Sequence, residues 1–188
     1  MMNSKKRLLP WKTLTEREVF SAQPWFSISV QKIELPDGRV VDDFYRIHLP
    51  ETAAVFALTD NNKVILLRNY KHGFGRVCYS FPGGIMHRDE NALEAARREL
   101  LEETGYEAPD WLHLGSFVPH SNYGCGKFNF YLAHHARQVR PPDSGDLEEM
   151  DLSLLDMDEV VTALKTGEIV SMSGAALVGL ASLHFRSI

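Results

Sequence analysis

Hydrophobic and polar positions alternate in short stretches along most of this chain, with the period of two that is typical of half-buried β-strands. One stretch, residues 53–58, is apolar throughout and predicts a strand buried on both faces. Turn signals at Pro36-Asp37-Gly38 and Asp60-Asn61-Asn62 separate neighbouring stretches. The predicted strands span residues 25–33, 40–49, 53–58, 64–71, 77–81, 112–118, 127–135 and 150–154.

A helical period appears in three places. In the first, Leu93, Ala96 and Leu100 fall on one arc and would face a core. Asp89 can cap the start of this helix, and Gly105 can end it in a left-handed conformation. The other helices are predicted over residues 156–165, ended by Gly167, and 174–185, capped by Ser173.

The order of these elements predicts two parts. Residues 1–50 hold the first two strands and form an antiparallel N-terminal segment, within which residues 1–24 carry little pattern. Residues 51–188 hold the remaining strands and all three helices. Residues 81–84, Phe-Pro-Gly-Gly, predict a loop directly before the first helix.

Composition narrows the functional classes. The chain has 188 residues and a net charge of −5, without a basic stripe, so it is not expected to bind nucleic acid. Its two cysteines, Cys78 and Cys125, predict a reducing compartment. No apolar run approaches the roughly 20 residues of a membrane span, and the N-terminus does not resemble a secretory signal. We therefore expect a cytoplasmic protein.

The run from residue 84 to 106 is the strongest candidate for chemistry. Glu99, Glu102 and Glu103 would share one helix face, where each close pair of like charges costs a few tenths of a kcal/mol. Arg98 can link Glu94 and Glu102, but Glu99 and Glu103 have no obvious local cation. A hard divalent ion such as Mg²⁺ would resolve the repulsion. The alternative is a solvated amphipathic helix without a ligand.

This run resembles the Nudix box, in which a glycine, a glutamate and an Arg-Glu-aliphatic-x-Glu-Glu-x-Gly-hydrophobic segment follow at fixed spacing. The matching residues are Gly84, Glu90, Arg98, Glu99, Leu100, Glu102, Glu103, Gly105 and, as the closing hydrophobic, Tyr106. The resemblance implies an α/β/α sandwich with a mixed central sheet, in addition to the N-terminal antiparallel strands. Residues 51–188 would then be a Nudix hydrolase domain.

The resemblance also implies a reaction, the metal-dependent hydrolysis of a nucleoside diphosphate linked to another moiety, X. Two to three Mg²⁺ or Mn²⁺ ions would be held by Glu99, Glu102, Glu103 and the carbonyl of Gly83. Arg98 would orient the carboxylates, and Glu103 is assigned to catalysis as well as to metal binding.

Two flanking segments are similar to the ADP-ribose pyrophosphatase branch of the family. Arg68, Tyr70 and Arg76 precede the box where that branch has an Arg-x-Tyr-Arg run, although the last residue of the run is Lys71 here. Pro119 follows the box as in that branch. Tyr123 is a candidate for base stacking, with ordinary packing as the alternative. The predicted substrate contacts are therefore Arg68, Tyr70, Arg76, Pro119 and Tyr123.

The general base is expected in the acidic loop after residue 140. The resemblance to ADP-ribose pyrophosphatases implies that a glutamate of this loop activates the attacking water. Glu148 and Glu149 are the best-placed candidates, and Asp146 is the next choice. The alternative is a flexible charged loop. Nothing in the sequence selects one of the three acids.

The predicted substrate is ADP-ribose, cleaved to AMP and ribose 5-phosphate, with another nucleotide sugar as the second choice. A Nudix-fold sensor that binds such a ligand without cleaving it is the competing hypothesis, although no box glutamate is lost. The resemblance further implies a homodimer formed through residues 1–50. The alternative is an N-terminal sheet that covers its own subunit.

Overall fold

The computed structural model describes residues 8–143, 145 and 149–186. The chain forms two compact units. The first contains the chain up to Pro50 together with residues 120–126, and the second contains residues 51–119 and the chain from Lys127 onward.

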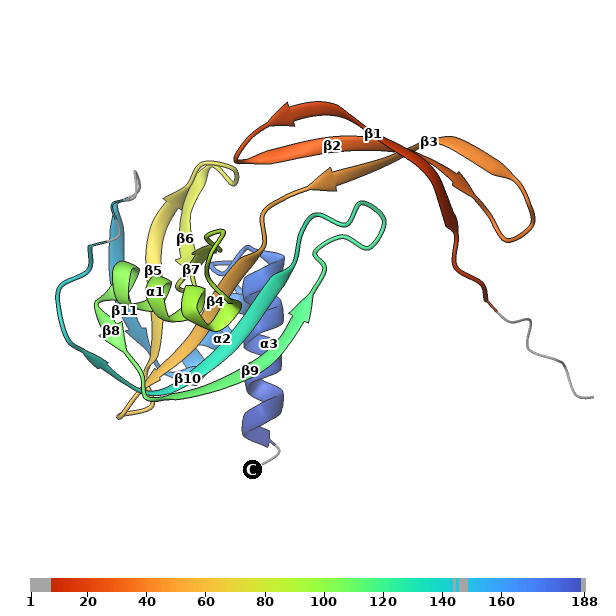
Figure 1. Ribbon diagram of the computed structural model, residues 1–188. Helices are drawn as coiled ribbons and strands as arrows, with labels where there is room; N and C mark the ends of the chain where they lie inside the picture. The colour runs from red at the N-terminus through yellow and green to blue at the C-terminus, as the bar shows by residue number, and fades with distance from the viewer. Residues whose placement is uncertain (1–7, 144, 146–148, 187–188) are drawn as a thin grey trace, which may run out of the picture. The chain divides into compact units, whose positions relative to one another are not determined.

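The N-terminal unit is a three-stranded antiparallel sheet in the order β1-β2-β3 (Figure 1). Its strands are β1 (Lys12–Ala22), β2 (Phe26–Glu34) and β3 (Val40–His48). β2 and β3 confirm the predicted hairpin, whereas β1 was missed. All but the last residue of β1 are exposed, so burial imposes no hydrophobic alternation on it, and pairing with β2 makes it a strand.

The second unit is built on an eight-stranded sheet in the order β11-β5-β4-β10-β8, with β6 on β5, β7 on β4 and β9 on β10. β4 and β10 run parallel and the other pairs antiparallel, so the sheet is mixed. The strands are β4 (Thr52–Thr59), β5 (Val64–Lys71), β6 (Arg76–Ser80), β7 (Gly83–Ile85), β8 (Tyr106–Glu107), β9 (Asp110–Phe117), β10 (Phe128–Gln138) and β11 (Met150–Leu155).

Helices cover both faces of this sheet (Figure 1). Helix α1 (Ala92–Thr104) buries Ala96 and Leu100 against one face, together with alternate residues of β4 such as Val55. Helices α2 (Met157–Lys165) and α3 (Met172–Arg186) cover the other face and pack against Phe56. The α/β/α sandwich with a mixed sheet is therefore confirmed, and residues 53–58 of β4 are apolar throughout because this strand is covered on both sides. Among the described residues, no helix is long and apolar enough to cross a membrane.

The ends of α1 are set by hydrogen bonds. The prediction of Asp89 as its cap was wrong, because Asn91 holds that position and its side chain accepts from the backbone N–H of Glu94 at 3.0 Å. The Glu94 carboxylate in turn accepts from the backbone N–H of Asn91 at 2.8 Å, which completes a capping box. Gly105 ends the helix with φ of 75°, as predicted.

Two further local predictions were also wrong. The cap of α3 is Ser171 rather than Ser173, since the Ser171 hydroxyl accepts from the backbone N–H of Gly174 at 3.0 Å. The second half of the predicted Phe-Pro-Gly-Gly loop is the start of strand β7, where Gly83 and Gly84 pair with Ala54 and Ala53 of β4. The two glycines are therefore held by the sheet.

Candidate functional site

Two glutamates of α1 reach consecutive residues of β7. Glu103 accepts a hydrogen bond through Oε2 from the backbone N–H of Gly83 at 2.8 Å. The Glu99 carboxylate lies so close to Gly84 that a Cβ there would be 2.3 Å from Glu99 Oε1. Only glycine leaves room for this approach. The predicted residues Glu99, Glu103 and Gly83 are thus brought together at one edge of β7.

Arg98 holds three glutamates. Its Nε and Nη2 donate to the two oxygens of Glu90 at 3.0 and 2.7 Å, and its Nη1 donates to Glu99 at 2.8 Å and Glu102 at 3.1 Å. Nη2 also donates to the carbonyl of Ile85 at 3.1 Å, which ties the guanidinium to β7. A forked pair of this kind fixes the position of both side chains.

The predicted ladder from Glu94 through Arg98 to Glu102 was half right. Arg98 does bind Glu102, but Glu94 is engaged in the capping box, and Glu90 takes its place. Glu90 matches the box glutamate, yet sequence reasoning gave it no role. Hydrogen bonds from Arg98 lower the pKa of Glu90 to about 2, and the same bonds raise the pKa of Arg98 above its usual range.

The ion pair between Glu90 and Arg98 predicts a pH-dependent contribution to the free energy of unfolding. The lowered pKa of Glu90 means that its contribution is complete above its ordinary pKa of 4.5 and is lost as the pH falls toward about 2. We expect Glu90→Gln to cost about 2 kcal/mol at pH 7, because it removes charge-assisted hydrogen bonds from a side chain that is 14% exposed. Urea unfolding without divalent ions should show this difference shrinking between pH 4.5 and 2.

Asp89→Asn is the matched control, since Asp89 is the exposed acid beside Glu90. It should leave stability unchanged across the same pH range. Equal stability of Glu90→Gln and the wild type at pH 7 would show that the hydrogen bonds between Glu90 and Arg98 do not stabilise the fold.

The donor atoms suit a hard divalent cation. Glu99 and Glu103 present carboxylates beside the backbone of Gly83 and Gly84. The Glu102 carboxylate binds Arg98, which also binds Glu99. Within the part of the chain that the structure describes, no three His, Cys, Asp or Glu side chains are grouped so that they could hold a metal ion by themselves. Mg²⁺ is commonly bound by one or two carboxylates, water and substrate phosphates rather than by such a cage. The arrangement therefore fits Mg²⁺ or Mn²⁺ better than zinc.

The structure places the predicted substrate residues on several different segments. Arg68 and Tyr70 are exposed on β5, and Arg76 donates through Nη2 to the carbonyl of Gly167. Pro119 is exposed in the second unit, but Tyr123 belongs to the N-terminal unit, where its ring centroid lies 4.7 Å from that of His120.

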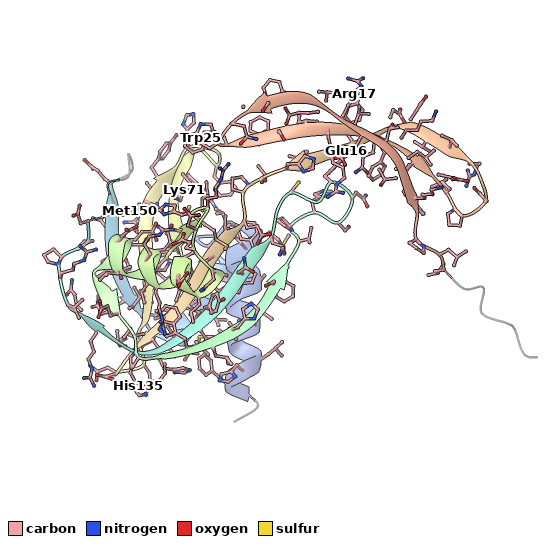
Figure 2. All side chains as sticks on the ribbon, in the orientation of Figure 1. Glu16, Arg17, Trp25, Lys71, His135 and Met150 are labelled. Atoms are coloured by element: carbon pink, nitrogen blue, oxygen red, sulfur yellow. The ribbon has the colours of Figure 1, made fainter. Side chains whose placement is uncertain are left out.

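The loop with the candidate bases is anchored at both ends. Near its start, after β10, the backbone N–H of Asp143 donates to the carbonyl of Glu102 at 2.7 Å, so this part of the loop is attached to α1. At its end, Glu149 is exposed directly before Met150, which pairs with Asn69 of β5 (Figure 2 labels Met150). Glu148 and Asp146 lie outside the described residues.

A cavity of about 210 Å³ adjoins the site, and sequence reasoning missed it. Gly83, Gly84 and Glu103 line it, as does Lys71 at the end of β5, which Figure 2 labels. Most of the rest of its lining comes from β4, β6, β10 and the start of α3, with Phe74 and Phe81 from the connections beside β6.

The NUDIX domain model matches residues 48–171, which is most of the chain and includes the whole acidic site. The chain belongs to the NUDIX domain family. A second model, the nucleoside diphosphate sugar hydrolase N-terminal domain, matches residues 11–47 of this Nudix protein.

Individual relatives agree with the family but differ in what they do. The ADP-ribose pyrophosphatase of Bacillus subtilis is 27% identical over 154 residues, which cover 80% of this chain and 82% of that protein. The methanol dehydrogenase activator of Bacillus methanolicus is 28% identical over 164 residues, covering 87% and 88%. A crystal structure of an ADP compounds hydrolase matches 97% of both chains with a TM-score of 0.82 at 21% identity, which shows the same fold. The chain is accordingly a Nudix hydrolase, as predicted.

Proposed function

We propose that this Nudix hydrolase cleaves the pyrophosphate bond of a nucleoside diphosphate linked to a sugar, with ADP-ribose as the first choice and AMP and ribose 5-phosphate as products. The observation that carries the proposal is the convergence of Glu99 and Glu103 on Gly83 and Gly84, beside an Arg98 that holds Glu99 and Glu102. The matched nucleoside diphosphate sugar hydrolase N-terminal domain and the ADP-ribose pyrophosphatases among the relatives support the substrate class.

Divalent ions, two to three of Mg²⁺ or Mn²⁺, would neutralise the phosphates and lower the pKa of a bound water. In this proposal Glu99, Glu102, Glu103 and the carbonyl of Gly83 would hold them. Arg98 keeps two of these carboxylates in position through its hydrogen bonds.

Glu148 or Glu149 would accept the proton of the attacking water. The anchoring of their loop at α1 and at β11 supports this role, because both anchors belong to the unit that carries the acidic site. The exposed cations Arg68 and Arg76 remain candidates for binding the anionic substrate.

The test is product identification with a panel of nucleotide sugars and dinucleotides, with and without Mg²⁺. We expect AMP and ribose 5-phosphate from ADP-ribose only when the metal is present. Tight binding of ADP-ribose without hydrolysis of any panel member would instead support the ligand-sensor hypothesis.

We further propose that the protein is a homodimer formed through residues 1–50 of the N-terminal unit. This part of the chain leaves several large apolar side chains open to solvent, among them Trp11 (57% exposed), Phe20 (50%), Trp25 (65%) and Tyr45 (51%). This number of exposed large apolar side chains in one small unit favours an interaction surface there. Sedimentation should give twice the 21.3 kDa of one chain, and Phe20→Glu should reduce it to a monomer. A wild-type protein of single-chain mass would contradict the proposal.

A further inference from the structure

A second hollow lies in the second unit, between α1 and the segment that leads from β8 into β9. Its volume of about 320 Å³ is at the lower end of the roughly 300–1,000 Å³ that is typical of ligand pockets. Apart from Arg98, its lining residues take no part in the acidic site. They are Arg97, Arg98 and Leu101 of α1 on one side, and Glu107, Ala108 and Trp111 on the other.

Trp111 gives the hollow an aromatic ring that is held in place. Its Nε1 donates to the carbonyl of Ala108 at 2.8 Å, and its ring meets that of Tyr131 edge to face, with the centroids 6.3 Å apart. Trp111 is nevertheless only half-buried. A planar ligand can therefore stack on this indole without the cost of ordering a mobile side chain.

The two consecutive arginines of the hollow differ in how far their donors are used. Arg98 donates five hydrogen bonds, to three glutamates and one backbone carbonyl. Arg97 is exposed and has no hydrogen-bond or ion-pair partner among the described residues, and its guanidinium carbon lies 5.7 Å from the centroid of the Trp111 ring. Its five N–H groups are thus available to an anion, and phosphate matches their forked geometry.

Glu107 adds a third chemical feature, an exposed carboxylate that can accept hydrogen bonds from hydroxyl or amino groups. A simple aromatic acid offers an anion and a ring, but it has no such donors. A nucleoside monophosphate offers all three features, because its base can stack on Trp111, its phosphate can bind Arg97, and its sugar hydroxyls can donate to Glu107.

We infer that this hollow is a second ligand site, and that it binds a nucleoside monophosphate through Trp111, Arg97 and Glu107. The inference does not depend on the proposed function, since none of these three residues belongs to the acidic site. Arg98 lines the hollow as well, so a ligand there lies beside the residue that holds Glu99 and Glu102.

Nuclear magnetic resonance tests the location of the site, because the chain has three tryptophans and each gives one indole N–H signal. The signal that disappears in Trp111→Phe belongs to Trp111. We expect AMP to shift this signal saturably in the wild-type protein without divalent ions, a condition in which the acids of α1 repel phosphate. A Trp111 signal that stays unmoved up to roughly 10 mM AMP would overturn the inference.

Calorimetry under the same conditions tests Arg97. We expect Arg97→Gln to weaken AMP binding about tenfold or more, because charge-assisted hydrogen bonds to the phosphate are lost. Arg97 is exposed and glutamine is a good helix former, so this variant should stay folded.

Arg88→Gln is the matched control for charge, since Arg88 is exposed just before α1 and does not line the hollow. It should bind AMP within about twofold of the wild type. Equal losses in the two arginine variants would mean that AMP responds only to the general charge of the surface, which would overturn the inference.

A comparison of ligands tests the aromatic contact. Ribose 5-phosphate has the phosphate and the sugar hydroxyls but no base, so it should bind the wild type at least about tenfold more weakly than AMP. Trp111→Leu should remove most of this difference while thermal unfolding shows that it is folded. Equal affinities of the wild-type protein for AMP and ribose 5-phosphate would overturn the inference without any variant.

The inference and the proposed function fail in different experiments. A wild-type enzyme that releases no AMP from any member of the substrate panel would contradict the proposed function and leave the hollow as a binding site. An unmoved Trp111 signal would remove the hollow as a binding site and leave the proposed function intact.

Discussion

Glu103→Gln is expected to lower kcat for ADP-ribose at least about 100-fold while the protein stays folded. The amide loses the negative charge that a divalent ion requires, but its oxygen can still accept the hydrogen bond that Glu103 receives from Gly83 at 2.8 Å. β7 should therefore stay in place. Steady-state kinetics with saturating Mg²⁺, together with thermal unfolding, separate loss of chemistry from loss of structure.

Glu94→Gln makes the same chemical change on the same helix and is the control. Glu94 belongs to the capping box, in which glutamine serves as well as glutamate. This variant should keep wild-type kcat and stability. If Glu103→Gln also kept full activity, Glu103 would have to be removed from the mechanism.

The fold was predictable where burial imposes a pattern. β4 is covered by α1 on one face and by α2 and α3 on the other, so its residues 53–58 are apolar without interruption. Ala96 and Leu100 lie on the predicted arc of α1 for the same reason. β1 has no such cover within its sheet, and its mixed residues gave no sign of a strand that pairing alone creates.

Only those contacts of the acidic site that join residues of one helix could be predicted from sequence spacing. Helical geometry placed Glu99, Glu102 and Glu103 together, and Arg98 beside Glu102. It also favoured Glu94 as a partner of Arg98 over Glu90, which lies outside the helix and approaches Arg98 through the turn that precedes α1. Glu90 is one of the residues that match the Nudix box, and this match was the available sign that it has a role in the site.

The cavity was not predictable from local patterns because its walls come from distant segments. Thr52, Ser80 and Ser171 are separated by 28 and 91 residues along the chain and line one cavity only in the folded protein. None of them belongs to a motif.

Gly84→Ala is expected to reduce kcat about 100-fold through a single methyl group, because small displacements of catalytic groups have effects of this size. The new Cβ would lie 2.3 Å from Glu99 Oε1, so the carboxylate must move away from β7 and from its contact with Arg98. The displaced atoms are the end of a flexible side chain, so the loss of stability should be small. Kinetics and thermal unfolding measure the two effects separately.

Gly179→Ala is the control, because Gly179 is an exposed residue of α3 with nothing within 4 Å of an added Cβ. It should retain activity and raise stability by up to about 1 kcal/mol. A shorter acid at position 99 gives a stricter test of the displacement. Glu99→Asp should impair the wild type, yet cost less in the Gly84→Ala background, where the shorter side chain avoids the methyl group. Additive losses in the double variant would mean that Gly84 acts on the reaction by a route other than Glu99.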